Sequence, residues 1–199
     1  MSVPHTASEP LNIRGMRVVE HRFTVPLDHS VPGGEQITVF AREYSDPEVA
    51  AAGDLPWLLY LQGGPGGKGN RLLQFGGWTK AASRHFRILM LDQRGTGLST
   101  PANRQTLAAR GDAAAQAEYL THFRADSIIA DAELIRAALG SGPWSIYGQS
   151  YGGFCALTYL SFAPDGLKEV LITGGLAPLW GPADRVYQAT FARVAARNA

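Results

Sequence analysis

The sequence has one cysteine, almost no excess charge and no long apolar run. Cys155 has no second cysteine to pair with, which excludes an internal disulfide and a zinc site built on several thiolates. The 18 lysines and arginines nearly balance the 17 aspartates and glutamates, and no basic block favours nucleic acid as a partner. No segment approaches the roughly 20 apolar residues of a membrane-spanning helix. We therefore predict no metal, no nucleic-acid partner and no membrane partner.

The length and composition predict one globular domain. With 199 residues, 45% of them hydrophobic, the chain can bury a sizeable core. Residues 1–17 are polar and lack the apolar stretch of a signal peptide. We therefore predict a polar N-terminal extension there, a core in residues 18–182 and, by default, a cytoplasmic location.

Hydrophobic patterns predict strands that alternate with helices. Residues 18–25 and 36–44 alternate apolar and polar side chains, which indicates two antiparallel strands at the leading edge of a sheet. Short apolar runs indicate further, buried strands at residues 57–61, 86–91, 144–147 and 169–173. This order predicts an α/β fold whose sheet is mostly parallel and flanked by helices.

Helical spacing indicates helices at residues 76–84, 127–139, 154–162 and 183–197, and residues 101–121 are partly helical or irregular. Asp126 or Ser127 can cap the second of these helices, and Gly140 can end it. Pro178 and Pro182 break the chain before the last one. We expect Cys155, on the third helix, to be a small buried side chain and not a reactive thiol.

The stretch at residues 143–154 has the pattern of a catalytic elbow. A short apolar run ends at Gly148-Gln149-Ser150-Tyr151-Gly152, and a helix-compatible segment follows at once. A G-x-S-x-G turn needs glycine where the backbone is crowded, and it presents the serine at the carboxyl end of a strand. Ser150 is therefore a candidate nucleophile, although so short a motif also occurs by chance.

Two other apolar runs end in glycine-bearing loops. Residues 58–67 read LLYLQGGPGG, and residues 88–99 read ILMLDQRGTGLS. In a parallel sheet such loops meet the elbow at one edge. The first loop is either a plain Gly/Pro turn or a source of backbone N–H donors for an oxyanion. In enzymes with a G-x-S-x-G elbow, the acid of the Ser-acid-His catalytic triad follows the serine in the chain. Asp92 and Arg94 precede Ser150, so they are better interpreted as bonding to loop backbone than as catalytic.

The three loops together resemble a known family. QGGPG at residues 62–66, DQRGTGLS at 92–99 and GQSYGG at 148–153 are similar, in order and spacing, to the prolyl aminopeptidase (proline iminopeptidase) family of α/β-hydrolases. The resemblance extends over residues 18–179. It implies an α/β-hydrolase core, with the start of a mostly helical cap at residues 183–199.

The resemblance also implies an activity, that of a serine peptidase releasing N-terminal proline, or another residue, from peptides. Ser150 would attack the scissile carbonyl, the N–H groups of Gly64 and Tyr151 would hold the oxyanion, and water would hydrolyse the acyl-enzyme. The substrate would be a peptide with a free N-terminus, and no cofactor is implied. Gln62 stands where the family usually has histidine, which we interpret as the mark of a subgroup. An esterase or acyltransferase of the same fold is the alternative enzyme.

The sequence has no histidine after Ser150. The histidines that precede it are His5, His21, His29, His85 and His122. In α/β-hydrolases the acid and then the base follow the serine. The acids that do follow it are Asp165, Glu169 and Asp184. Asp165 lies in a turn and Glu169 opens a strand, so neither of these two matches the late position of the acid in the family. We expect His21 and His29 to be hydrogen-bonded or solvated and not metal ligands.

This arrangement predicts that the chain is the N-terminal portion of a longer enzyme, truncated before the last strands and inactive by itself. We also expect self-association through an unpaired apolar sheet edge at residues 170–173. A non-catalytic fragment that persists by pairing with a partner chain is the alternative from another functional class.

Overall fold

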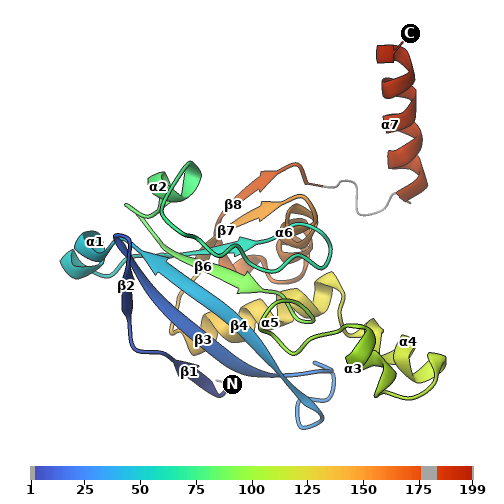
Figure 1. The fold of residues 1–199 in the computed structure, drawn as a ribbon, viewed down its shortest axis with the longest axis horizontal. Coiled ribbons are helices and arrows are strands. Elements are labelled where there is room, and N and C mark those ends of the chain that lie inside the picture. The colour runs from blue at the N-terminus through green and yellow to red at the C-terminus, as the bar shows by residue number, and fades with distance from the viewer. Residues whose placement is uncertain (1–2, 176–182, 199) are drawn as a thin grey trace.

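The computed structural model describes residues 3–175 and 183–198 as an α/β fold built on one sheet (Figure 1). Its eight strands run in the order β1-β3-β4-β6-β5-β7-β8, and β2 also pairs with β3. Their bounds are β1 His5–Ala7, β2 Leu11–Ile13, β3 Met16–Pro26, β4 Gln36–Ser45, β5 Trp57–Leu61, β6 Arg87–Asp92, β7 Trp144–Gln149 and β8 Leu167–Thr173. The predicted α/β class and its principal strands are confirmed.

The sheet is mixed and not mostly parallel. Strands β6, β5, β7 and β8 pair in parallel, whereas every pairing among β1 to β4, and that of β4 with β6, is antiparallel. The difference arises from residues 1–17, predicted as a polar extension, which contribute β1 and β2 to the antiparallel half. Only the parallel half has carboxyl ends at a common edge.

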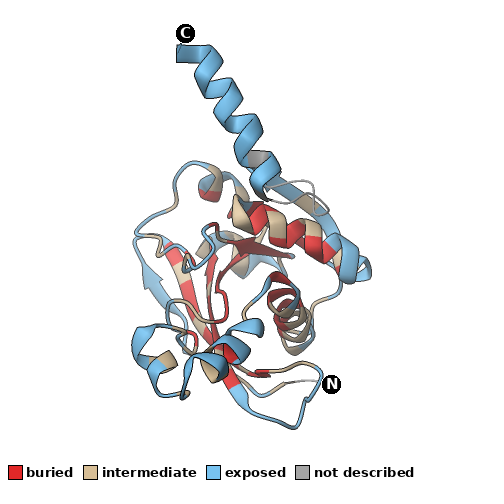
Figure 2. Cartoon of the chain, turned by 90° about the vertical axis from the view of Figure 1, so that its right-hand side faces the viewer, coloured by how far each residue is buried: buried red, intermediate tan, exposed pale blue. Residues whose placement is uncertain are grey.

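Two helices cover one face of the sheet, and their inward sides are buried (Figure 2). Helices α5 (Ala125–Ala138) and α6 (Tyr151–Phe162) pack against each other, and α6 packs on β7 and β8. The core between these helices and the sheet includes Leu59, Leu89 and Ile128. Each large apolar side chain buried in this way stabilises the fold by about 1.5–3 kcal/mol. Cys155 is fully buried here, as predicted.

The other face of the sheet carries a second, smaller apolar cluster. Met16, Tyr44 and Met90 are buried in it, and Trp78 of α2 packs against it. A pocket of about 440 Å³ opens beside this cluster, and its walls include Trp78, Leu171 and Ile172. This face is therefore less completely covered than the face beneath α5 and α6.

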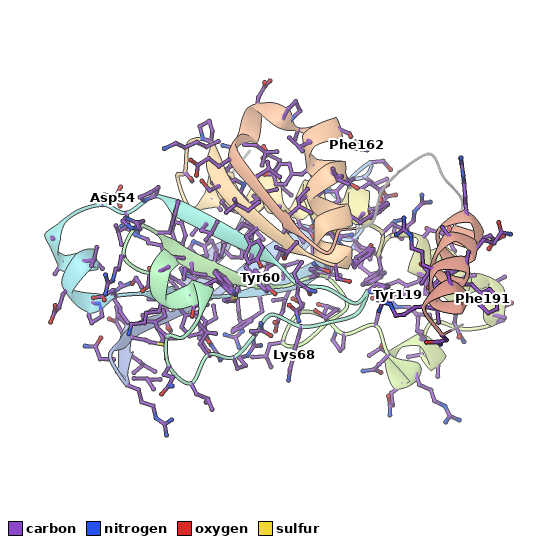
Figure 3. The ribbon with its side chains drawn as sticks, turned by 90° about the horizontal axis from the view of Figure 1, so that it is seen from above. Asp54, Tyr60, Lys68, Tyr119, Phe162 and Phe191 are labelled. Atoms are coloured by element: carbon purple, nitrogen blue, oxygen red, sulfur yellow. The ribbon has the colours of Figure 1, made fainter. Side chains whose placement is uncertain are left out.

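The remaining helices are α1 (Pro47–Ala52), α2 (Trp78–Ala82), α3 (Arg104–Ala108), α4 (Ala113–Thr121) and α7 (Ala183–Asn198). Helix α7 stands clear of the sheet in Figure 1, and its Phe191, labelled in Figure 3, is 76% exposed. The predicted break at Pro178 and Pro182 lies outside the described residues. Within residues 3–175 and 183–198, no helix is long and apolar enough to cross a bilayer.

The start of α5 differs from the prediction. The helix begins at Ala125 with Arg124 at the N-cap position, and no side chain caps it, so Asp126 and Ser127 lie inside the first turn. The predicted end is confirmed, because Gly140 follows the last turn with φ of 64°.

Strand β8 is exposed, although its apolar composition predicts a buried strand. It occupies one edge of the sheet and pairs only with β7 among the described strands. Leu171 is 52% exposed and Ile172 is 37% exposed. A strand with one free edge and exposed apolar side chains favours pairing with another chain.

We propose that the chain self-associates through this edge. Leu171→Lys or Ile172→Lys should shift the chain toward monomer, because a lysine on an edge strand disfavours the addition of another strand. Size-exclusion chromatography with light scattering, at several protein concentrations, measures the shift. Leu160→Lys is the matched control, because Leu160 is 42% exposed but lies on α6, and it should leave association unchanged. A wild-type chain that stays monomeric at every concentration would contradict the proposal.

Candidate active site

Ser150 lies at the sharp turn between β7, which ends at Gln149, and α6, which begins at Tyr151. Its φ of 54° and ψ of −117° are unusual for a residue with a side chain, and such strain costs on the order of 1–3 kcal/mol. The turn is held by backbone bonds on both sides: the Ser150 N–H donates to Thr173 O at 2.9 Å, and Gly153 N–H donates to Ser150 O at 2.8 Å. The strand-turn-helix context predicted for the elbow is confirmed.

The flanking glycines are required by close backbone contacts. A Cβ on Gly148 would lie 2.3 Å from the carbonyl oxygen of Gly152, and a Cβ on Gly152 would lie 1.9 Å from that of Leu61. Backbone atoms cannot give way as a flexible side chain can. These contacts explain physically why the pentapeptide has glycine at these two positions.

The glycine loop after β5 lies against the elbow. A Cβ on Gly63 would lie 3.0 Å from the Cβ of Ser150, so the backbone of Gly63 is an immediate neighbour of the serine. Gly64 follows it with φ of 138°, which few residues other than glycine adopt. The structure thus places the loop that bears Gly64 beside Ser150 and Tyr151. Sequence reasoning missed Gly63, whose signal was the absence of a side chain in a pair of glycines.

Side chains from β5 and from the loop after β6 hold the start of this glycine loop. The Tyr60 hydroxyl donates to Gln62 Oε1 at 2.7 Å, and Gln93 Nε2 donates to Gln62 O at 3.1 Å. Tyr60 lies near the middle of the sheet in Figure 3, and its ring stacks with Trp78 at 5.2 Å between centroids. Both the side chain and the carbonyl of Gln62 are therefore fixed before the glycines begin.

Asp92 has the structural role that the sequence favoured. Its side chain is fully buried and accepts hydrogen bonds from the backbone N–H groups of Gly69 and Leu98, each at 2.8 Å. Arg71 forms an ion pair with the same carboxylate. The loop can pass this closely because residue 97 is glycine, where a Cβ would lie 2.0 Å from Asp92 Oδ2. Asp92 therefore joins the loops on both sides of β6.

Arg94 also bonds to loop backbone, as predicted. Its buried guanidinium donates to the carbonyl oxygens of Pro26, Leu27 and His122 at 2.7–3.0 Å. It also forms an ion pair with the buried carboxylate of Asp131 on α5. This arginine positions loops and takes no part in the elbow itself.

Three of the histidines, His5, His21 and His29, have hydrogen-bond partners other than Ser150. His21 bonds to His5 and Glu43, and His29 bonds to Asp131, as expected for hydrogen-bonded side chains. His122 ends α4, and His85 lies on the wall of the pocket beside β8. Within the described part of the chain, the histidine side chains make no hydrogen bond to Ser150 Oγ.

Burial around the elbow helix raises the pKa of two of its titratable groups. Burial, and to a smaller degree Cys155, raises the pKa of the Tyr151 hydroxyl to about 12. Burial raises the pKa of the Cys155 thiol to about 12 as well, while a bond to Tyr151 acts in the opposite direction. Both groups are protonated near neutral pH, so Cys155 offers no thiolate nucleophile beside Ser150.

A protein-family model described as the alpha/beta hydrolase fold matches residues 56–199. The matched segment includes the elbow, the glycine loop and the parallel half of the sheet. The chain belongs to the α/β-hydrolase fold family.

Within that family, the predicted resemblance to prolyl aminopeptidases is confirmed. The chain is 53% identical over 195 residues to a proline iminopeptidase from Aeromonas sobria, covering 96% of this chain and 45% of that protein. It is 41% identical over 194 residues to the proline iminopeptidase aneH of Aspergillus aculeatus, covering 92% of this chain and 42% of that protein. The chain therefore spans less than half the length of these curated relatives.

Solved structures support the fold alone. A proline iminopeptidase-related protein from Thermus thermophilus matches with a TM-score of 0.51 at 21% identity, covering 85% of this chain and 55% of that chain. A hydrolase from Pseudomonas aeruginosa matches with a TM-score of 0.52, also at 21% identity, covering 78% of this chain and 48% of that chain.

The crowding at the elbow predicts a stability difference between two glycines. Gly152→Ala should lower the free energy of unfolding by about 1–3 kcal/mol, because the added methyl group overlaps the Leu61 carbonyl and forces α6 away from β5. Gly142→Ala is the matched control, since a Cβ there meets nothing within 4 Å, and it should change stability by less than about 0.5 kcal/mol. Urea denaturation of both variants measures the difference. Equal stability of the two would show that the contact is not restrictive.

Proposed function

We propose that this chain carries the nucleophile of a serine aminopeptidase that acts in the cytoplasm and releases N-terminal proline, or another residue, from peptides. The observation that supports it is the position of Ser150, strained at a strand-to-helix turn with the glycine loop at residues 62–67 against it. The relatives named as proline iminopeptidases support the substrate class. The substrate is a peptide with a free N-terminus, and the chemistry needs no cofactor.

The reaction would proceed through an acyl-enzyme. Ser150 Oγ forms a bond to the scissile carbonyl carbon while a general base takes its proton, and the carbonyl oxygen becomes an oxyanion. The N–H groups of Gly64 and Tyr151 are our candidates to stabilise it, each worth on the order of 3 kcal/mol. The C–N bond then breaks, the amine leaves with the proton, and water hydrolyses the ester to restore the serine.

The general base is the part of this mechanism that the described residues do not supply. His5, His21 and His29 are bonded elsewhere, and all five histidines precede the elbow in the chain. Without a base, a serine hydroxyl stays protonated and weakly nucleophilic near neutral pH. We therefore propose that the 199 residues by themselves are not a competent peptidase. Residues 183–199 are our candidate for the start of a helical cap.

The first test of this function uses a polypeptide of the relatives' length that contains these 199 residues. It should hydrolyse the p-nitroanilide of L-proline, and Ser150→Ala should lower kcat by about 10⁴-fold or more while leaving the far-ultraviolet circular dichroism unchanged. Ser161→Ala, whose hydroxyl bonds only to the α6 backbone, is the matched control and should retain activity. Activity of Ser150→Ala within tenfold of the wild type would remove this serine from the mechanism. Hydrolysis of a p-nitrophenyl ester but no amide would favour an esterase.

The second test uses the 199-residue chain alone. We expect no Ser150-dependent release of p-nitroaniline from proline or alanine p-nitroanilide, because loss of a triad member costs about 10⁴- to 10⁶-fold in kcat. The chain and its Ser150→Ala variant are assayed at the same concentration. Robust turnover that disappears in the variant would overturn the proposal and would require a base from among His85, His122 or Asp165.

A further inference from the structure

A cluster of titratable side chains lies at the β1 edge of the sheet, across the sheet from the elbow. His5 Nε2 lies 2.9 Å from His21 Nδ1, and His21 Nε2 lies 3.1 Å from Glu43 Oε2. The second carboxylate oxygen of Glu43 accepts from Arg17 at 2.9 Å. The side chains of His21 and Glu43 are each 5% exposed. The cluster therefore links β1, β3 and β4 through one buried hydrogen bond, between His21 and Glu43, and through partly buried ones to His5 and Arg17.

The bond between the two histidines limits how many protons the cluster can hold. With Glu43 ionised, His21 donates from Nε2 and accepts at Nδ1 from His5. One added proton is accommodated, because a charged His21 can donate to Glu43 and to a neutral His5 at the same time. Two added protons place two N–H groups face to face at 2.9 Å on two positive rings. Double protonation therefore breaks the bond.

This bond holds a short strand with few other anchors. The backbone hydrogen bonds between the β1 segment and β3 include one from the Ser8 N–H to Glu20 O and one from the Thr24 N–H to Pro4 O, each at 2.9 Å. In residues 3–8, only Val3 and His5 have partly buried side chains. The His5 ring stacks on Phe23 at 4.4 Å between centroids. Loss of His5 from its site would therefore leave residues 3–8 weakly held.

The charged groups around the histidines are paired elsewhere and do not replace the His5–His21 bond. Arg17 is paired with Glu43. Trp57 meets the His21 ring edge-on, and the Arg87 guanidinium that lies over Trp57 is paired with Asp54. On α5, which packs on this face, Asp131 pairs with Arg94, and Arg136 pairs with Glu133. Glu43 is therefore the carboxylate that bears directly on the histidine pair.

We propose that the His5–His21 pair is an acid-labile clasp: protonation of both rings releases residues 3–8 from β3 while the rest of the sheet stays folded. Burial, and then repulsion from His21, lowers the pKa of His5 below its ordinary value of 6.5. The docked strand thus binds fewer protons than the released strand. Docking is complete above about pH 6.5 and is lost progressively as the pH falls below it.

Amide hydrogen exchange on the 199-residue chain tests the clasp. After correction for intrinsic exchange rates, the Ser8 and Thr24 amides should exchange faster at pH 5.5 than at pH 7.5, by up to about tenfold, since one proton taken up below pH 6.5 shifts the equilibrium by up to about tenfold per pH unit. The Leu59 and Leu89 amides of the central strands should show no such increase. A chelator is present throughout, so that an adventitious metal ion on the histidines does not contribute.

Two variants separate the clasp from a general effect of acid. His5→Phe keeps a ring to stack on Phe23 but removes the titrating group, so exchange at Ser8 and Thr24 should change less than about twofold between the two pH values. His85→Gln, at a histidine far along the chain, should respond like the wild type. A flat wild-type response, an unchanged response in His5→Phe, or a parallel increase at Leu59 and Leu89 would each overturn the proposal.

Discussion

The close contact between the backbone of α6 and the end of β5 is the constraint on which the site depends. With no Cβ at Gly152, the first turn of the helix rests directly on the Leu61 carbonyl. That position brings the residues after Leu61 beside Ser150, which adopts a φ of 54° at the turn. Because protein interiors are close-packed, strand, glycine loop and helix cannot shift independently.

Much of this arrangement could be predicted from local sequence patterns. The parts that depend on packing between distant segments could not. Strand β5 and the elbow were predictable because apolar runs and crowded glycines act within a few residues. Strands β1 and β2 are short and largely exposed, and they exist because β3 offers them a partner. The exposure of β8 depends on what lies next to it and not on its own residues. The glycine pair marked Gly63 as a crowded position but did not identify Ser150 as its neighbour, because that contact joins segments far apart in sequence.

Asp92 and Arg94 show how charge at the carboxyl end of a strand can serve structure. A buried carboxylate or guanidinium is costly unless its hydrogen-bonding capacity is filled. Asp92 meets this condition with two backbone N–H groups and Arg71, and Arg94 meets it with three carbonyl oxygens and Asp131. Motif residues next to a nucleophile therefore need not touch substrate for the site to depend on them.

The partners of Arg94 also bear on the order of folding. Its hydrogen bonds reach residues 68 positions back along the chain, at Pro26, and 37 positions ahead, at Asp131. A buried guanidinium loses its hydration, and hydrogen bonds to only some of these partners would not replace it. The burial of Arg94 is therefore unfavourable until all the segments are in place. The strand end at Pro26, the turn after α4 and helix α5 are thereby joined into one cooperative unit. Contacts of such long range form late, because the loops between them must close first.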